Sequence, residues 1–235
     1  MTTLLLIRHG RSSANTKGIL AGRRPGMHLD DLGREQAAKA AERIADIPLN
    51  RMVSSPLERC QETIAAVAAT RRRKVVTDDG FIEADYGSWS GKKLSDLAKD
   101  PLWPVVQNHP SAVTFPGRTG EAMTDMAARA IRAVRRHNAK VGPDGVWLAC
   151  SHGDVIKSIV ADALGLHLDQ FQRIMIDPAS ITVIRYTEQR PFVAVTNSTS
   201  GTLAPYVAQA PSGSDAAVGG GAGPSGSAHP RRAID

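Results

Sequence analysis

The stretch that decides the fold is Leu4-Leu5-Leu6-Ile7-Arg8-His9-Gly10-Arg11-Ser12. Its run of apolar residues is typical of a strand that is buried on both faces. The strand delivers Arg8 and His9 together, and Gly10 permits a sharp turn and a close approach of the backbone to a ligand. Because open α/β sheets bind ligands at the carboxyl ends of their parallel strands, we expect Arg8 and His9 at the mouth of a site.

A second stretch, at residues 146–154, has the same design. It reads Val-Trp-Leu-Ala-Cys-Ser-His-Gly-Asp, which is an apolar strand followed by His152, Gly153 and a helical pattern. Two such units in one chain predict two imidazoles, those of His9 and His152, that converge on one site.

Strands and helices alternate along the rest of the chain. We expect long helices at residues 29–46, 56–69, 119–140 and 154–164, and short ones at 92–99 and 102–108. Further strands are expected at 52–54, from residue 75, at 181–186 and at 192–195, the last two as a hairpin turned by residues 188–190, whereas 81–87 is expected to be a loop. This alternation predicts an α/β sheet with helices on both faces.

Length and composition favour one domain with a tail. At 235 residues the chain can bury a full core, which we assign to residues 1–208. Residues 209–235 are rich in Gly, Ser, Ala and Pro, so they cannot bury enough apolar surface to order themselves, and we expect a disordered tail.

Charge, aromatic content and cysteine usage limit the partners and the compartment. The net charge is +6, but only 4% of residues are aromatic, so nucleic-acid bases have few stacking platforms and we expect no nucleic-acid partner. The first apolar run is too short for a signal peptide or a membrane span. Cys60 and Cys150 are interpreted as small buried residues in a reducing compartment, which favours a cytoplasmic protein without a membrane partner.

Charged and polar loop residues are expected to gather at the strand ends: Arg8, His9, Arg11, Asn15, Arg59, Glu83 and His152. Arginine presents a planar fork of donors that matches phosphate oxygens. The backbone amides that begin the helix at Gly153 would add partial positive charge. This combination predicts an anion pocket. Each residue alone has an ordinary structural interpretation, and their joint appearance at strand ends favours function.

A metal site is the rival interpretation of the same residues. His9, His152 and Glu83 make up a two-histidine, one-carboxylate set that is known to bind metals. The guanidinium groups of Arg8 and Arg59 would repel a divalent cation, so we expect neither a metal nor another cofactor.

In a phosphate pocket a neutral imidazole can act as the nucleophile, because the free pKa of histidine is about 6.5. The phosphoryl group would pass to His9, and Arg8, Arg59 and His152 would stabilise charge on its oxygens. Glu83 would protonate the departing alkoxide and then deprotonate the water that cleaves the phosphohistidine.

Taken together, these residues resemble the histidine phosphatase superfamily, in its phosphoglycerate mutase-like branch. The motifs that carry the resemblance are Arg8-His9-Gly10-Arg11-Ser12 with Asn15, Ser54-Ser55-Pro56-Leu57 with Arg59, Glu83 with Tyr86-Gly87, Gly120-Glu121 and Ser151-His152-Gly153-Asp154. The resemblance implies a three-layer α/β/α sandwich with a mostly parallel central sheet. It also implies that His9 is phosphorylated, that Glu83 is the proton donor, and that Arg8, Arg59 and His152 form the phosphate pocket, with Asn15, Gly153 and Arg11 as further binding residues.

The sequence departs from the family pattern at the rim of the expected pocket. Arg11 stands where members often have Glu, Ser90 replaces a frequent Glu, and residues 118–122 keep only part of a Gly-Gly-Glu-Ser pattern. These departures remove no residue of the phosphate pocket, so we expect them to affect the choice of substrate and not the reaction mechanism. Basic residues on nearby loops could contact a leaving group or be solvated: Arg23, Arg24, Lys92, Lys93 and Arg118.

The leading functional hypothesis is a phosphatase, a phosphoric monoester hydrolase acting on a small phosphorylated metabolite. The alternative is a phosphomutase of the phosphoglycerate mutase type. Dedicated mutases of the family carry a longer insertion after the Glu, rich in Tyr and Arg, whereas residues 92–116 are short here, which favours the phosphatase. A catalytically inactive phosphate-binding module is a third hypothesis, which the presence of every pocket residue disfavours. The sequence is compatible with a homodimer and does not fix the oligomeric state.

Overall fold

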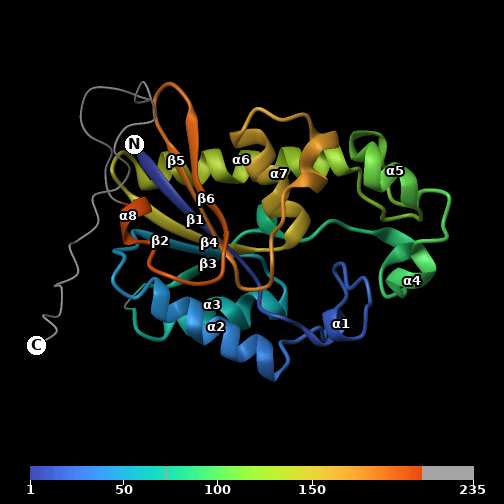
Figure 1. Cartoon of the computed structure of the whole chain (residues 1–235), viewed down its shortest axis with the longest axis horizontal. Helices are drawn as coiled ribbons and strands as arrows, with labels where there is room; N and C mark the ends of the chain where they lie inside the picture. The colour runs from blue at the N-terminus through green and yellow to red at the C-terminus, as the bar shows by residue number, and fades with distance from the viewer. Residues whose placement is uncertain (72, 208–235) are drawn as a thin grey trace, which may run out of the picture.

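A computed structural model describes residues 1–71 and 73–207, and its central feature is one mixed β-sheet (Figure 1). In this part of the chain the strand order is β3-β2-β4-β1-β5-β6. The strands are β1 (Thr2–Arg8), β2 (Arg51–Ser54), β3 (Val75–Thr77), β4 (Val146–Ser151), β5 (Ile181–Tyr186) and β6 (Pro191–Ser198). The first four are mutually parallel, and β5 and β6 form an antiparallel hairpin at one edge. The expected mostly parallel sheet and its terminal hairpin are confirmed.

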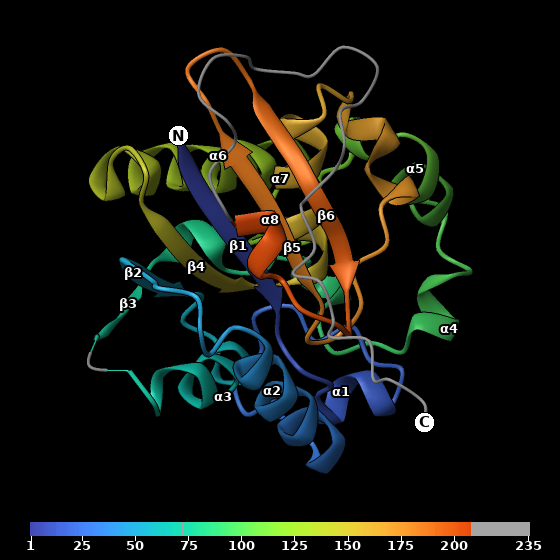
Figure 2. The same ribbon diagram turned by 60° about the vertical axis from the view of Figure 1, so that its left-hand side comes forward.

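Helices cover both faces of this sheet (Figures 1 and 2). One face carries α2 (Asp31–Arg43) and α3 (Glu58–Ala68), and the other carries α6 (Met123–Val141) and α7 (Gly153–Ala163). Side chains of a strand alternate between its two faces. Accordingly Leu4 and Leu6 of β1 are buried in the α6–α7 layer, whereas Leu5 and Ile7 are buried in the α2–α3 layer. The expected three-layer α/β/α sandwich is confirmed.

The register of β1 and β4 brings the two histidine motifs together. Arg8 pairs with Ser151 in this parallel ladder, and the His9 amide donates to the Ser151 carbonyl at 2.9 Å. His9 and His152 therefore leave the sheet side by side at the carboxyl ends of adjacent strands. The sequence predicted that the two imidazoles converge, and the register of β1 and β4 is the reason that they do.

Short elements surround the sandwich. They are the helices α1 (Ser13–Thr16), α4 (Leu94–Leu97), α5 (Trp103–Asn108) and α8 (Ala204–Val207), and the 3-10 turns η1 (Asp79–Phe81), η2 (Gly87–Trp89), η3 (Pro110–Ala112) and η4 (Leu168–Arg173). The helix expected from residue 119 begins only at Met123, because Ala122 bridges to Thr114. The helix expected from residue 56 begins at Glu58, because Ser55 and Leu57 form a turn in which the Leu57 amide donates to Ser55 Oγ.

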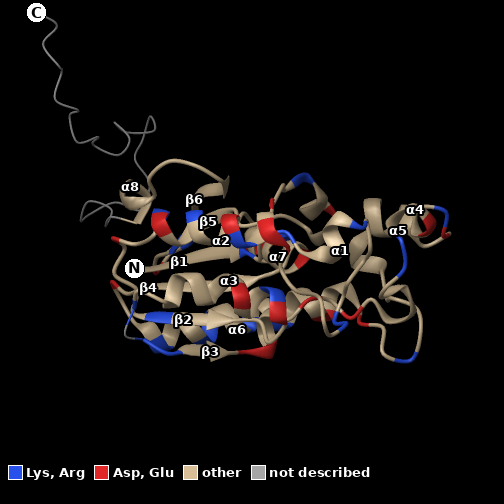
Figure 3. Cartoon of the chain, turned by 90° about the horizontal axis from the view of Figure 1, so that it is seen from below, with Lys and Arg blue, Asp and Glu red and all other residues tan. Residues whose placement is uncertain are grey.

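The cysteines, the helices and the charged residues of the described part of the chain bear on the expectations from composition. Cys60 and Cys150 are free and buried, as interpreted from the sequence. No helix within residues 1–71 and 73–207 is long and apolar enough to cross a membrane. Basic and acidic segments are interspersed along the helices and loops (Figure 3). The tail predicted at residues 209–235 lies outside the described residues.

Candidate active site

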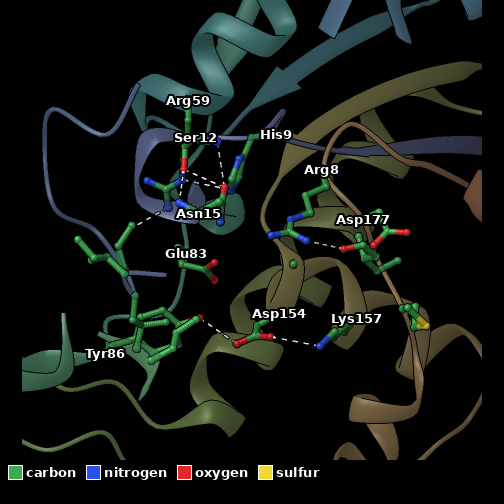
Figure 4. Close-up of a pocket in the computed structure, with 18 of the residues that line it drawn as sticks. Arg8, His9, Ser12, Asn15, Arg59, Glu83, Tyr86, Asp154, Lys157 and Asp177 are labelled. Atoms are coloured by element: carbon green, nitrogen blue, oxygen red, sulfur yellow. Dashed lines mark hydrogen bonds and ion pairs between the residues drawn. The ribbon is translucent and has the colours of Figure 1, made fainter. Parts of the chain in front are cut away.

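A cavity of about 390 Å³ opens at the carboxyl ends of β1 and β4 (Figure 4). Of the residues predicted from the sequence, six line it: Arg8, His9, Asn15, Arg59, Glu83 and Gly153. His152 is fully buried beneath it and contacts Arg59 and Glu83. The backbone at Gly10 packs against the Gly33 carbonyl. A Cβ at residue 10 would collide with that carbonyl, so this position requires glycine.

The contacts of His9 expose one ring nitrogen for chemistry. Its Nδ1 lies 2.7 Å from the Gly10 carbonyl oxygen, an acceptor only, so Nδ1 carries the proton and donates. The lone pair is therefore on Nε2, which accepts from Arg59 Nε at 3.2 Å. Burial, followed by the charges of Arg59 and Arg8, holds the pKa of His9 well below its usual value. His9 thus presents a neutral, oriented imidazole to the cavity.

His152 is fixed on the opposite side of Arg59. Arg59 Nη2 donates to His152 Nδ1 at 3.1 Å, so the proton of His152 lies on Nε2, which donates to Ser55 Oγ at 2.8 Å. The two imidazole rings meet edge to face with centroids 5.2 Å apart. Burial, then the charge of Arg59, also lowers the pKa of His152 well below its usual value.

The two arginines each retain an unused buried donor. Arg8 Nη1 donates to the Ile176 carbonyl at 2.6 Å, and Arg59 Nη2 also donates to the Gly22 carbonyl at 2.9 Å. Within the described residues, Arg8 Nε and Arg59 Nη1 are buried without a hydrogen-bond partner. Arg71 and Arg185 also have an unpartnered buried Nε, but Arg8 and Arg59 differ from them in lining the cavity. Because an unpaired buried donor is costly, two such donors at one cavity favour an anion as its ligand.

Gly153 brings a helix end to the same place. It begins α7, and a Cβ at this position would lie 3.7 Å from the Arg8 Cζ and Nε atoms. The first amides of α7 therefore stand beside the Arg8 guanidinium and add the partial positive charge of a helix N-terminus. Asn15 lines the opposite wall, where Ser12 holds its Oδ1 through two hydrogen bonds of 3.0 and 2.8 Å.

Glu83 is the buried carboxyl group of the pocket. It is 8% exposed, its Oε1 accepts from the Ala84 amide at 3.0 Å, and its Oε2 lies 3.9 Å from His152 Nδ1. Burial, followed by the negative charge of Asp154, raises the pKa of Glu83 to about 7, although Arg59 opposes this rise. Glu83 can therefore both donate and accept a proton near neutral pH.

A clamp holds the backbone of Glu83 in place. Arg23 Nε and Arg129 Nη2 both donate to the Glu83 carbonyl, at 2.8 and 3.1 Å. Glu121 joins the two arginines through bonds of 2.8 Å to Arg23 Nη2 and 2.7 Å to Arg129 Nε. Glu121 Oε2 also accepts from Arg129 Nη2 at 3.0 Å and from the amide of Asp85 at 3.1 Å. The Gly120-Glu121 motif thus fixes the segment that carries Glu83, a role that the sequence did not reveal.

Arg11 lies apart from the predicted pocket residues. Its Nε donates to Asp30 Oδ2 at 2.7 Å, and Arg11 is not among the residues that line the cavity. Only Gly10 separates Arg11 from His9, but the bond to Asp30 holds the Arg11 side chain away from the pocket. Nor do the basic loop residues line it: Arg23, Arg24, Lys92, Lys93 and Arg118.

Several lining residues were missed by the sequence reasoning. Tyr86 and Asp154 stood within the quoted motifs without an assigned role, and the Tyr86 hydroxyl donates to Asp154 Oδ2 at 2.8 Å. Lys157 also lines the cavity and lies one helical turn after Asp154 in α7. This spacing in the sequence could have predicted that both side chains share one face of the helix. The segment from Gln172 to Asp177 also lines the cavity but carries no motif.

Among residues 1–71 and 73–207, no group of three or more His, Cys, Asp or Glu side chains is arranged to hold a metal ion. Metal independence remains a prediction, and the donors described above favour an anion.

Comparison with known proteins places this chain. A model of the histidine phosphatase superfamily (branch 1) matches residues 4–199. The fold agrees with that of Bacillus stearothermophilus YhfR, with a TM-score of 0.79, 26% identity, and coverage of 85% of this chain and 98% of that one. The chain belongs to the histidine phosphatase superfamily, as the sequence motifs indicated.

Curated relatives in the family differ in length and in name. The bifunctional protein Rv2228c of Mycobacterium tuberculosis is 32% identical over 203 residues, and the match spans 84% of this chain but only about half, 54%, of that protein. Phosphoserine phosphatase 1 of Hydrogenobacter thermophilus is 28% identical, covering 85% of this chain and 93% of the relative. The 2,3-bisphosphoglycerate-dependent phosphoglycerate mutase of Thermoplasma acidophilum is 27% identical, covering 78% and 87%.

Proposed function

We propose that this protein is a phosphatase that hydrolyses phosphomonoesters of small metabolites through a phosphohistidine on His9. The observation that carries the proposal is the pair of unpartnered buried donors, Arg8 Nε and Arg59 Nη1, beside the neutral His9 in one cavity. Family membership and the relatives named as phosphatases support hydrolase or phosphotransferase chemistry at this site.

The first step is transfer of the phosphoryl group to the protein. His9 Nε2 attacks phosphorus, the bond from phosphorus to the ester oxygen breaks, and the proton of Glu83 passes to that oxygen, so an alcohol leaves. The donors of Arg8 and Arg59 and the first amides of α7 bind the phosphoryl oxygens throughout. The hydrogen bond from Arg59 Nε to His9 Nε2 breaks as His9 attacks, and this donor turns to the phosphoryl oxygens.

The second step regenerates the site. Glu83, now ionised, takes a proton from a water molecule, whose oxygen attacks phosphorus as the bond to His9 breaks. Inorganic phosphate and the starting protonation state result, so one ester and one water give one alcohol and one phosphate. His152 Nδ1 accepts from Arg59 Nη2 and so orients Arg59 between the two imidazoles, and it acts on the phosphoryl charge through that guanidinium.

A phosphomutase is the second candidate, favoured by the relative named as a phosphoglycerate mutase. The two functions use the same first step and differ in the acceptor, which is water for the phosphatase and a second hydroxyl for the mutase. Residues 92–116 form only short elements, α4, α5 and η3, and of these residues Leu94 alone lines the cavity, which favours access of water.

The test is the release of inorganic phosphate from a panel of phosphorylated metabolites, with transfer between hydroxyls of phosphoglycerate followed in parallel. We expect phosphate release that His9→Ala abolishes, and His109→Ala, at an exposed histidine outside the pocket, should keep the rate. Isomerisation that outpaces phosphate release would favour the mutase. No turnover of any kind, with intact phosphate binding, would contradict both.

A further inference from the structure

The cavity extends beyond the part that a phosphoryl group would fill. This outer part is walled by the apolar side chains Ile19, Leu20, Leu94, Ile174, Met175 and Ile176. They come from three separate segments: the loop after α1, the start of α4, and the connection between η4 and β5. A cavity of about 390 Å³ is in the range that encloses whole small molecules, so there is room for a leaving group.

Two exposed apolar side chains stand at this opening. Within the described residues five large apolar side chains are exposed, and two of them, Leu94 and Met175, line the cavity. Met175 is 69% exposed and Leu94 is 40% exposed. Exposed apolar groups that converge on one pocket from different segments indicate contact with an apolar part of a ligand.

Lys157, the one cation that the described residues contribute to the outer part, already has partners. Lys157 Nζ lies 3.8 Å from Asp154 Oδ1 and donates to Gln172 Oε1 at 3.0 Å, and its side chain is only 19% exposed. The other cations of the cavity lining, Arg8 and Arg59, serve the phosphoryl group in the proposed reaction. Among the described residues, the lining therefore leaves no uncommitted cation for a second anion.

Among the described residues, carboxylates outnumber cations in this outer part. Asp154 and Asp177 both line it, and Asp177 Oδ2 accepts from the Asn197 amide at 2.8 Å. No ion pair joins Asp177 to a cation within the described residues. A second negative charge on the leaving group would lie among these carboxylates and be repelled.

We infer that the leaving group of the natural substrate is an uncharged and largely apolar alcohol, so that its phosphate is the only anionic group. This inference rests on the phosphatase function proposed above and narrows it. It disfavours substrates whose alcohol carries a carboxylate, such as phosphoglycerates. Phosphate esters of primary alcohols share the same type of leaving oxygen, so the charge and the polarity of the rest of the leaving group can be varied separately.

The experiment compares kcat/KM for n-hexyl phosphate, n-propyl phosphate, glycerol 3-phosphate and 3-phosphoglycerate. The last two differ only in a hydroxymethyl group against a carboxylate. We expect glycerol 3-phosphate to exceed 3-phosphoglycerate by roughly tenfold or more, because partly screened charges would repel the carboxylate. Hexyl phosphate should exceed propyl phosphate, because each buried methylene adds about 0.8 kcal/mol, or about fourfold.

Charge variants provide the matched control. Met175→Lys adds a cation to the outer part, and Asp177→Asn removes a carboxylate; both should lower the preference for glycerol 3-phosphate over 3-phosphoglycerate. Leu164→Lys adds the same charge at an apolar side chain that is 51% exposed and outside the lining, and should leave the preference as it is in the wild type.

Two results would overturn the inference while leaving the phosphatase function intact. One is equal hydrolysis of glycerol 3-phosphate and 3-phosphoglycerate by the wild type. The other is a change of preference in Leu164→Lys as large as that in Met175→Lys. Failure to release phosphate from all four esters would instead contradict the phosphatase function, and the inference would fall with it.

Discussion

Imidazole, guanidinium and carboxylate groups meet in the pocket around His9 and also in a second cluster of described residues, around His137. His137 is 1% exposed, its Nε2 donates to Asp78 Oδ2 at 2.8 Å, and its Nδ1 accepts from Arg51 Nε at 2.9 Å. Arg136 Nη2 adds a bond of 2.6 Å to the same Asp78 oxygen. Every buried polar atom of the His137 and Asp78 side chains therefore has a partner among the described residues.

The pocket differs in what it leaves unpaired. Arg8 Nε and Arg59 Nη1 are buried without partners within the described residues, and both residues line a cavity. In the cluster around His137, hydrogen bonds and an ion pair to Asp78 join α6 to η1. In the pocket, by contrast, two arginine donors have no partner. The same residue types thus serve the fold where all their polar atoms are paired, and they mark a candidate site where unpaired donors line a cavity.

The largest effect is expected from Glu83→Gln, which removes the proton donor but keeps the shape. Turnover of alkyl phosphates should fall by roughly 10²–10⁴-fold, the usual range for general acid–base catalysis. For nitrophenyl phosphate the first phosphoryl transfer should be nearly normal, because nitrophenolate leaves without a proton. Rapid-mixing kinetics would measure both.

The matched control for Glu83 is Asp85→Asn. Asp85 Oδ1 accepts from the Gly87 amide at 2.9 Å, and Asp85 does not line the cavity. Its loss should slow alkyl and nitrophenyl esters by the same small factor. Equal slowing of the first phosphoryl transfer from both ester types by Glu83→Gln would show that Glu83 is not the acid.

The next effect contrasts one arginine from each cluster. Arg59→Met should lower kcat/KM by about 10²–10³-fold, as expected when a donor to a developing oxyanion is removed. Arg51→Met should change kcat/KM only a few-fold and should instead lower the melting temperature, because it costs His137 a buried hydrogen bond, about 1–3 kcal/mol. Steady-state kinetics and thermal unfolding of both variants would measure this. Equal kinetic losses would erase the distinction between the clusters.

A smaller effect concerns stability and pH. Because the pKa of Glu83 is raised to about 7, the folded protein binds more protons than the unfolded chain between the usual value of 4.5 and that value. The wild type therefore loses stability as pH rises through this window, by about 3 kcal/mol at most. Glu83→Gln should unfold at higher urea concentration than the wild type at about pH 8, with the gap closing below about pH 4.5.

His137 should respond to pH in the opposite direction. Burial lowers the pKa of His137 from its usual value of 6.5, so the folded protein keeps it neutral. Stability held by this group is present above that value and is lost as pH falls below it. A stability gap between wild type and Glu83→Gln that widened towards acid pH would contradict the raised pKa of Glu83.

The smallest effect is expected from metal removal. The positive charge of the pocket comes from Arg8 and Arg59, so prolonged dialysis against EDTA should leave phosphate release unchanged. The measurement is the rate before and after dialysis, followed by addition of single divalent metals. Loss of activity that one particular metal restored would revive the two-histidine, one-carboxylate interpretation of His9, His152 and Glu83.

The sequence predicted those parts of the protein that repeat a strong local pattern. The apolar runs before His9 and His152 fixed β1 and β4 as central strands, and the same motifs placed both imidazoles at the strand ends. Glu83 and Arg59 could be predicted because they follow β3 and β2 along the chain.

The remaining features depend on directions and distances that no local pattern contains. Arg11 follows His9 closely in sequence, yet its side chain pairs with Asp30. Ile176 accepts from Arg8 although 168 residues separate them, and the segment that carries it has neither a motif nor a helical period. The clamp of Arg23 and Arg129 on Glu83 likewise joins three distant loops and helices, so only the folded chain reveals it.

The most direct test of the central claim is to trap the phosphoryl group on His9. Glu83→Gln should be mixed rapidly with radiolabelled nitrophenyl phosphate, quenched in alkali, where phosphohistidine survives, and mapped by peptide. Phosphorylation should proceed without the acid, whereas hydrolysis should stall without the base, so label should accumulate on His9 to nearly one equivalent and be absent in Glu83→Gln combined with His9→Asn. Release of one equivalent of nitrophenolate with label on a serine or an aspartate, or with no label on the protein, would contradict the account.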